Sequence, residues 1–373
     1  MEDQRKTTIC ISANTSWNLS NFRTKLIRDL ISKGYSVAAI SPEDKYTDKL
    51  VELGVKHFQI NMDNKGLNVW EDIKVLRQYI RLYRRIKPDA VLHFTIKPVI
   101  YGSLAAKLVG VNAINTMTGL GTAFISLGYI KYLIMIVLRL ALQSSRIVYF
   151  HNHEDLQFFD THHLVKKARS KVIGGSGVDT EHFSFQPILK TNNTKFLFVG
   201  RLLRDKGIIE FIEAAKIVIA ERDNIEFQIL GPADVKNRSA LSSIELDELL
   251  SQSSIIYLGS KLDVRQYIKD AHCVVLPSYR EGLSRVLLEA GSMGRPVIAS
   301  NVPGCRDVVI NGHNGFICEE KNSKDLAEKI LLLESLGHSK ISDLGLNGRA
   351  RVKELFSEKI IVSEYIDAIE RAI

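Results

Sequence analysis

Two glutamates in the second half of the chain have a spacing that could bind both ends of a nucleotide diphosphate sugar. Glu281 and Glu289 lie eight residues apart in SYREGLSRVLLEAGSMGRPVIAS, between two apolar runs that predict strands. If residues 284–293 form a helix, the step covers about 12 Å along its axis, similar to the distance from ribose to hexose in such a ligand. One carboxylate would then accept hydrogen bonds from ribose hydroxyls and the other from sugar hydroxyls. The spacing alone equally allows one helix-start residue and one surface residue.

A basic loop earlier in the same half supplies groups for the diphosphate. In FVGRLLRDKGIIEFI, Arg201 directly follows a predicted strand, and Lys206 precedes Gly207 and a predicted helix. Helix-terminal N–H groups and fixed positive charge both stabilise an anion. We therefore expect the diphosphate to be held by these two cations and by the backbone N–H groups of Gly282 and Leu283. The alternative is that both cations are ordinary surface residues of a strand-to-helix loop.

Strand and helix patterns alternate along the whole chain. KTTICISA predicts a buried strand, NTSWNLS a polar loop, the next segment a helix that ends at Gly34, and YSVAAIS a second strand. Strand, helix and strand with short links form the βαβ unit of a parallel sheet. The pattern restarts at KFLFVG, residues 195–200. The sequence predicts an α/β protein with two Rossmann-like parallel-sheet domains facing across a cleft, where ligands of such sheets bind.

The predicted domains have specific boundaries. Residues 1–180 form the N-terminal domain, residues 181–194 an aperiodic linker, residues 195–355 the C-terminal domain, and residues 356–373 a final amphipathic helix. A chain of 373 residues is long enough for two cores. Its four widely separated cysteines predict buried, reduced thiols in a cytosolic protein rather than a disulfide framework or a zinc site.

Positive charge is concentrated in the first half. Residues 1–190 carry 26 Lys and Arg against 16 Asp and Glu, within a net charge of +8 for the whole chain. Much of it lies in a predicted amphipathic helix over residues 70–88, which is either a solvated face or a surface drawn to anionic lipid. No nucleic-acid-binding motif accompanies the charge. The apolar segment 128–142 is interrupted by Lys131 and Arg139 and is shorter than the roughly 20 residues of a membrane span, which favours a buried or interfacial helix.

One cluster of polar residues could be mistaken for a metal site. His151, Asn152, His153 and Asp155 follow one another closely in YFHNHEDLQFF. They lie where a predicted strand changes into a helix, so we expect Asn152 to cap that helix with Asp155 in its first turn.

Three strings of the second half resemble the retaining glycosyltransferases of family 4, which have the GT-B fold. They are VGRLLRDKG, LPSYREGLSRVLLEAGSMGRPVIASNVPGCRDVV and NGFIC. The N-terminal strings SANTSWNLSNFRTKLIRDLISKGYSVAAISP, HFTIKPVIYGSLAAKL and TGLGTAF are similar to a bacterial subgroup that extends undecaprenyl-diphosphate-linked acetamido sugars in O-antigen, capsule and glycoprotein glycan assembly.

The resemblance implies roles for individual residues. Glu281 would face the donor sugar, Glu289 the ribose, and Arg201 with Lys206 the diphosphate, so Glu281, Arg201 and Lys206 form the expected catalytic group. The final helix would cross back onto the first domain. The donor would be a UDP-sugar, with N-acetylgalactosamine favoured and N-acetylglucosamine, glucose and galactose left open. The acceptor would be a polyprenyl-diphosphate-linked saccharide, used at the inner face of the plasma membrane by a peripherally attached cytoplasmic enzyme.

The sequence departs from this family at one position. Many members have a histidine where Thr118 stands in NTMTGLG. His93 is a candidate replacement, although a histidine at the end of a strand is more often structural. Asn14, Thr15 and Ser16 occupy the first loop and are expected to contact the acceptor or the diphosphate.

The expected chemistry is metal-independent transfer with retention. No Asp-x-Asp pair occurs in the chain, and the cations would stabilise the charge that grows on the leaving UDP. Retention, with the donor phosphate accepting the acceptor's proton, is implied by the resemblance alone. A glycoside hydrolase would have no use for the cationic loop, and a dinucleotide-dependent dehydrogenase would need a G-x-G-x-x-G string that is absent after both first strands. A sugar-nucleotide epimerase of the same fold and a non-catalytic nucleotide-sugar-binding subunit remain as alternatives.

Overall fold

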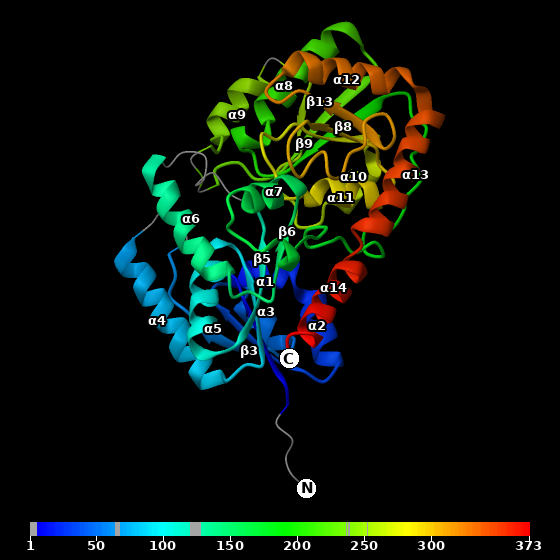
Figure 1. Cartoon of the computed structure of the whole chain (residues 1–373). Coiled ribbons are helices and arrows are strands. Elements are labelled where there is room, and N and C mark those ends of the chain that lie inside the picture. The colour runs from blue at the N-terminus through cyan, green and yellow to red at the C-terminus, as the bar shows by residue number, and fades with distance from the viewer. Residues whose placement is uncertain (1–5, 64–67, 120–127, 236, 238, 252) are drawn as a thin grey trace. The chain divides into compact units, whose positions relative to one another are not determined.

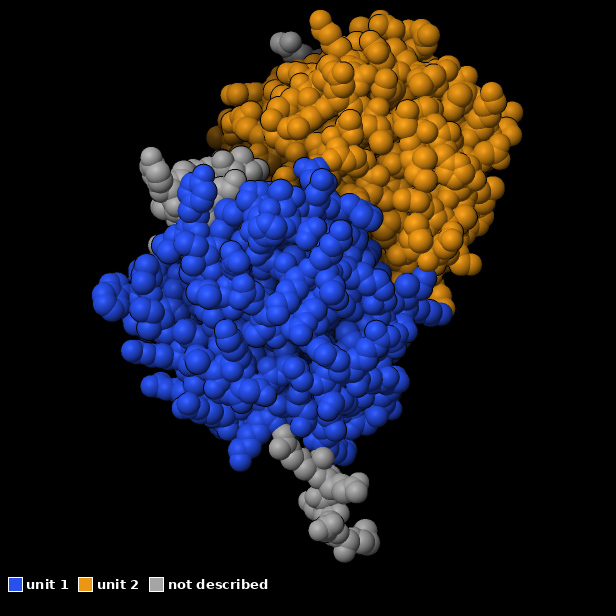
Figure 2. All heavy atoms as spheres, viewed as in Figure 1, with its two compact units in different colours: residues 1–176, 359–373 blue, residues 177–358 orange. Residues whose placement is uncertain are grey.

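The computed structural model describes residues 6–63, 68–119, 128–235, 237, 239–251 and 253–373 and divides into two compact units. Unit 1 contains residues 1–176 and 359–373, and unit 2 contains residues 177–358 (Figure 2). Residues 181–194, expected to form a linker, therefore belong to unit 2.

Unit 1 is built on a seven-stranded parallel sheet with the order β3-β2-β1-β4-β5-β6-β7. Strands β3, β5 and β6 of this sheet are labelled in Figure 1. Its strands are β1 (Thr8–Ser12), β2 (Ser36–Ser41), β3 (Lys56–Gln59), β4 (Ala90–Phe94), β5 (Asn112–Met117), β6 (Ile147–Phe150) and β7 (Ser170–Val172). Its helices are α1 (Ser16–Phe22), α2 (Thr24–Ser32), α3 (Thr47–Glu52), α4 (Val69–Ile86), η1 (Pro98–Gly102), α5 (Ser103–Val109), α6 (Gly128–Leu142), α7 (His153–Thr161), η3 (Lys167–Arg169) and α14 (Glu358–Glu370).

Both faces of this sheet are buried, because successive side chains of a strand point to opposite sides. Ile9 and Ile11 of β1 pack with α2 and α14, whereas Cys10 between them packs in the cluster that contains α4 and α5. Tyr365 of α14 lies fully inside the first of these clusters. The final helix therefore forms part of the unit 1 core.

The start of unit 1 differs from the sequence-based expectation. The predicted polar loop NTSWNLS is mostly helix α1, which begins after Thr15, whose side chain accepts a hydrogen bond from the N–H of Asn18 at 3.1 Å. The helix predicted next is interrupted at Arg23, where the backbone leaves helical geometry before α2. A cap of this kind gives a hydrogen-bond partner to a backbone N–H group in the first turn, which stabilises a helix that has few apolar residues.

Unit 2 is built on a six-stranded parallel sheet with the order β10-β9-β8-β11-β12-β13. Its strands are β8 (Thr194–Val199), β9 (Ile225–Leu230), β10 (Ile256–Tyr257), β11 (Cys273–Leu276), β12 (Val297–Ser300) and β13 (Gly315–Cys318). Its helices are η4 (Arg204–Lys206), α8 (Ile208–Glu221), α9 (Ser243–Leu250), α10 (Arg265–Asp270), α11 (Arg285–Ser292), α12 (Ser323–Ser335) and α13 (Gly337–Leu355). The two parallel sheets confirm the predicted fold class.

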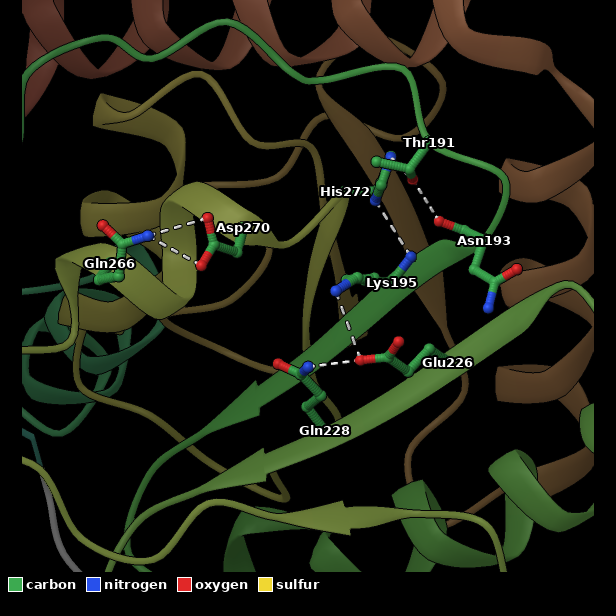
Figure 3. A network of polar contacts seen from close by, with 8 residues as sticks. All are labelled: Thr191, Asn193, Lys195, Glu226, Gln228, Gln266, Asp270 and His272. Carbon is green, nitrogen blue, oxygen red and sulfur yellow. Dashed lines mark hydrogen bonds and ion pairs between the residues drawn. The ribbon is translucent and has the colours of Figure 1, made fainter.

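Residues 181–194 are tied to the amino-terminal edge of the unit 2 sheet. His272, just before β11, accepts a hydrogen bond from the N–H of Lys195 at 3.1 Å and lies 3.2 Å from the hydroxyl of Thr191 (Figure 3). The fully buried Arg295 donates to the carbonyl of Gln186 at 2.9 Å. The aperiodic segment is thus a packed strap of unit 2.

Helix α6 has one buried and one exposed apolar face. Ile134 and Leu138 are buried, whereas Leu133 and Ile136 are more than half exposed. None of the helices in the described ranges combines the length and apolarity that crossing a bilayer requires. The four cysteines are buried free thiols, as predicted.

Candidate functional site

The strand order of the unit 2 sheet reverses between β8 and β11. From this point the chain adds β9 and β10 on one side and β12 and β13 on the other. Ligands of open parallel sheets bind outside the carboxyl ends of the strands at such a point. The loops after β8 and β11 contain Arg201, Lys206 and Glu281, so the fold brings three predicted site residues to the expected place.

Two glycines allow these loops to approach each other closely. Gly207 has a φ of 73°, and a Cβ atom there would overlap the carbonyl oxygen of Pro277 in the loop after β11. Gly304 has a φ of 76°, and its Cβ would lie 2.7 Å from the carbonyl oxygens of Glu281 and Gly282. Left-handed backbone and lack of space both favour glycine at these positions. Backbone contacts therefore set the position of Glu281.

Lys206 and Glu281 form an ion pair across the two loops. Their side chains are 23% and 11% exposed, and the hydroxyl of Ser278 donates to the same Glu281 oxygen at 2.7 Å. Sequence reasoning identified both charged residues but not their contact or the part played by Ser278. A cation and a carboxylate are thus held at one point of the sheet edge, partly open to solvent.

Arg201 and Glu289 lie in different surroundings. Arg201 is exposed and forms no ion pair with any described residue. Glu289 accepts a hydrogen bond from Nε of Arg285 at 2.9 Å, and its side chain is 12% exposed. Burial raises the pKa of the Glu289 carboxyl, and Arg285 opposes this shift.

Helix α11 spans Arg285–Ser292, one residue shorter at each end than the predicted helix over residues 284–293. It begins at Arg285, so Glu281, Gly282 and Leu283 precede it, and only Glu289 lies within it. The estimate of their separation along one helix axis therefore does not apply. The predicted diphosphate contacts of the Gly282 and Leu283 N–H groups stay a prediction.

Sequence reasoning also missed a tyrosine beside this site. The N–H of Tyr279 donates to the carbonyl of Asp205 at 3.0 Å, and its phenol donates to the buried carboxylate of Glu210 at 2.6 Å. These bonds join the loop after β11 to η4 and α8. Its position in the string LPSYREG was the only signal in the sequence.

The strand order of the unit 1 sheet reverses between β1 and β4. The N–H of Asn14, after β1, donates to the hydroxyl of Thr95, after β4, at 3.1 Å. Thr15 caps α1, and the fully buried Ser16 hydroxyl lies 2.8 Å from that of Ser41. The Ser16 hydroxyl is therefore used within unit 1, and the expected contact of this loop with the acceptor or the diphosphate stays a prediction.

His93 lies in a buried polar cluster of unit 1. Its Nε2 is 2.7 Å from the phenol oxygen of Tyr83 and its Nδ1 is 2.8 Å from Oδ1 of Asn115. The ring is fully buried, and burial lowers the pKa of His93 to about 4. Both ring nitrogens have partners, which favours the structural interpretation over a replacement for the missing histidine. Thr118, which stands where many family members have the histidine, is half-buried and lies directly after β5.

The predicted helix cap after β6 is confirmed. The side chain of Asn152 accepts a hydrogen bond from the N–H of Asp155 at 2.7 Å, and α7 begins at His153. Within the described parts of the chain, no group of three or more His, Cys, Asp and Glu side chains is arranged to hold a metal ion.

Comparison with known proteins assigns the chain to a family. Residues 8–152 match a family described as glycosyl transferase 4-like, and residues 179–351 match a family described as glycosyl transferases group 1. Each match covers most of one sheet and its loops. The chain therefore belongs to the glycosyltransferases that join these two domains, as the sequence motifs predicted.

Relatives named for a specific transfer are similar to this chain over most of its length. The N,N'-diacetylbacillosaminyl-diphospho-undecaprenol alpha-1,3-N-acetylgalactosaminyltransferase of Campylobacter jejuni is 28% identical over 376 residues, covering 95% of this chain and 96% of its own. The UDP-Gal:alpha-D-GlcNAc-diphosphoundecaprenol alpha-1,3-galactosyltransferase of Escherichia coli is 28% identical over 305 residues, covering 78% of each chain. A glycosyltransferase structure from Rickettsia africae matches with a TM-score of 0.80 at 18% identity and covers 99% of both chains, which shows the GT-B fold.

Proposed function

We propose that this chain transfers a sugar, N-acetylgalactosamine in the first instance, from UDP to a polyprenyl-diphosphate-linked saccharide in O-antigen, capsule or related glycan biosynthesis. Support for the substrates comes from the Campylobacter jejuni relative, which is named for this transfer and is similar over nearly its whole length. The observation that carries the proposal is the Lys206–Glu281 pair at the carboxyl edge of the unit 2 sheet. There, a cation for the diphosphate and a carboxylate for the sugar lie side by side.

Donor binding would exchange the partners of this pair. The diphosphate would take over Lys206 together with the exposed Arg201, and Glu281 would accept hydrogen bonds from sugar hydroxyls instead. Ser278 already bonds to Glu281 at 2.7 Å and would keep the carboxylate in place. As UDP leaves, the two cations stabilise the charge that develops on its β-phosphate, an effect worth a few kcal/mol per preorganised group.

The proposal includes metal independence and retention. Two cations at the diphosphate would do the work of a divalent metal ion, as the sequence suggested. Retention would follow if the acceptor hydroxyl approaches the face from which UDP leaves, so that the departing phosphate accepts its proton. Glu289, on α11, would bind the ribose hydroxyls.

We further propose that unit 1 attaches the enzyme peripherally to the cytoplasmic face of the membrane that holds its acceptor. The exposed face of α6 presents four large apolar side chains: Tyr132, Leu133, Ile136 and Leu140. Helix α4 exposes five cations: Lys74, Arg77, Arg81, Arg84 and Arg85. Both helices pack against α5 (Figure 1). Apolar insertion and attraction to anionic headgroups together are sufficient for reversible attachment.

The test is release of UDP by the purified chain in EDTA, with a panel of UDP-sugars and an undecaprenyl-diphosphate acetamido-sugar acceptor. We expect acceptor-dependent release from one donor, its loss in Glu281→Ala, and no change in Glu248→Ala, which removes an exposed carboxylate of α9. The anomeric configuration of the product, determined by NMR, tests retention. A chain that binds UDP but releases none across the panel would instead favour the epimerase or the non-catalytic subunit.

A further inference from the structure

His151 is a buried histidine at the carboxyl edge of the unit 1 sheet, directly after β6. The residue is 8% exposed, and its Nε2 has no hydrogen-bond partner among the described residues. A buried polar atom without a partner destabilises a fold, and nearly all such atoms are paired in native proteins. The atom therefore has a hydrogen-bonding capacity that the described residues leave unused.

The strand register places His151 beside Thr118. Met117 of β5 and Phe150 of β6 are paired Cα partners, so Thr118 and His151 are the next residues on adjacent parallel strands. Neighbouring strands lie about 4.8 Å apart. This edge of the sheet is where an open α/β fold binds its ligands. His93 is not available to a ligand in the same way, since both of its ring nitrogens have partners inside unit 1.

A buried cation lies in the same region. Arg23, which separates α1 from α2, is 3% exposed, and its guanidinium carbon lies 3.9 Å from the ring centroid of Phe94 at the end of β4. Burial, and to a smaller extent the charge of Arg23, lowers the pKa of His151 to about 3. The imidazole is thus neutral at physiological pH, with one nitrogen that donates and one that accepts a hydrogen bond. A neutral ring of this kind suits a hydroxyl group.

We propose that Nε2 of His151 forms a hydrogen bond with a hydroxyl group of the saccharide acceptor. The proposal rests on the transferase function proposed above and adds an acceptor contact in unit 1. It differs from the donor contacts of Lys206 and Glu281, which lie in unit 2. Loss of His151 should therefore change the use of the acceptor and leave the binding of UDP unchanged.

The experiment compares His151→Phe and His151→Leu with the wild-type chain and with His162→Phe, which replaces an exposed histidine at the end of α7. Either His151 variant removes the hydrogen bond, so one folded variant is sufficient. The measurements are kcat/KM for the acceptor, affinity for UDP by calorimetry, and Tm. We expect kcat/KM for the acceptor to fall at least about fivefold, consistent with one lost hydrogen bond. UDP affinity should stay unchanged and Tm should be equal or higher, because a buried unpaired atom is removed.

Two results would overturn the assignment while the wild-type chain is active. Unchanged kcat/KM in a folded His151 variant would mean that the nitrogen binds only water. A joint fall in Tm, UDP affinity and activity would mean that His151 supports the fold. A wild-type chain without transferase activity on the donor and acceptor panel would instead refute the proposed function, and the acceptor contact with it.

Discussion

Gly207 offers a quantitative test of how the two site loops are held together. Its φ of 73° is shared by the exposed Gly312, but the surroundings differ. A Cβ at Gly207 would overlap the carbonyl oxygen of Pro277 and lie 2.6 Å from its carbonyl carbon, whereas a Cβ at Gly312 would meet nothing within 4 Å. Left-handed backbone costs a non-glycine residue about 1–2 kcal/mol, so both alanine variants carry this term. Overpacking adds about 1–3 kcal/mol to Gly207→Ala alone.

The assay is urea denaturation of the full chain, with and without UDP. The transition that UDP shifts to higher urea reports the unit that binds the nucleotide, because a ligand stabilises the state to which it binds. In this transition we expect Gly207→Ala to unfold more easily than Gly312→Ala by about 1–3 kcal/mol, from the overpacking term alone. The variant should also bind UDP more weakly, since relief of the overlap moves Lys206 away from Glu281. Equal stability of the two variants with unchanged UDP affinity would refute the idea that this contact sets the site.

Three further predictions concern other parts of the chain. Arg295→Met should lower the free energy of unfolding by about 3 kcal/mol or more, because the buried guanidinium donates to the carbonyls of Gln186, Ile268 and Lys269, which would lose their partner. Burial raises the pKa of Glu289, so its carboxyl binds a proton more tightly in the folded chain than in the unfolded chain. The free energy of unfolding therefore falls as pH rises above about 4.3, the usual pKa of a glutamate. The Glu289→Gln variant lacks this carboxyl and should not lose stability in this way. At pH 7.5 without ligand it should be at least as stable as the wild-type chain, and it should bind UDP about tenfold more weakly. Leu133→Glu with Ile136→Glu should reduce binding to anionic vesicles at least about tenfold.

Matched controls separate these effects from general damage. Arg222→Met removes an exposed arginine at the end of α8, and a similar loss of stability there would contradict the role of Arg295. Val51→Glu places a charge at a half-exposed apolar residue of α3, and equal loss of vesicle binding would count against α6. We expect the stability of Glu289→Gln relative to the wild-type chain to be higher at pH 7.5 than at pH 4. The opposite result would contradict the predicted effect of pH.

The sequence was a good guide to the parallel sheets, because their strands are apolar on both faces and stand out as short continuous runs. It was a poor guide to α1, whose polar residues form a helix through the Thr15 cap rather than through an apolar stripe. Strand β13 was not predicted. It begins at Gly315, whose φ of 156° lies outside the usual strand geometry.

The site shows the same division between what is local in sequence and what is not. Arg201, Lys206 and Glu281 could be proposed because each lies in a loop directly after a recognisable strand. The Lys206–Glu281 contact joins residues 75 positions apart and depends on Gly207 and Gly304, which were not assigned a role beforehand. Ser16 illustrates the reverse case. Its loop was identified from the sequence, but the hydrogen bond between its hydroxyl and that of Ser41 was not.

The Lys206–Glu281 ion pair of the proposed donor site has a consequence for binding. Lys206 and Glu281 hold each other near the positions where a diphosphate and a sugar would need them, so both side chains are ordered before any ligand arrives. Ordering a long side chain on binding costs about 0.5–1.5 kcal/mol, and preorganisation removes this cost. The pair must nevertheless separate, and a ligand that supplies only one half leaves the other charge without its partner. A diphosphate without a sugar would draw Lys206 away from Glu281 and leave this carboxylate with Ser278 alone. If Lys206 and Glu281 bind the donor as proposed, the pair would favour a complete nucleotide sugar over the free nucleotide, which is the preference a transferase needs in order to release UDP after each cycle.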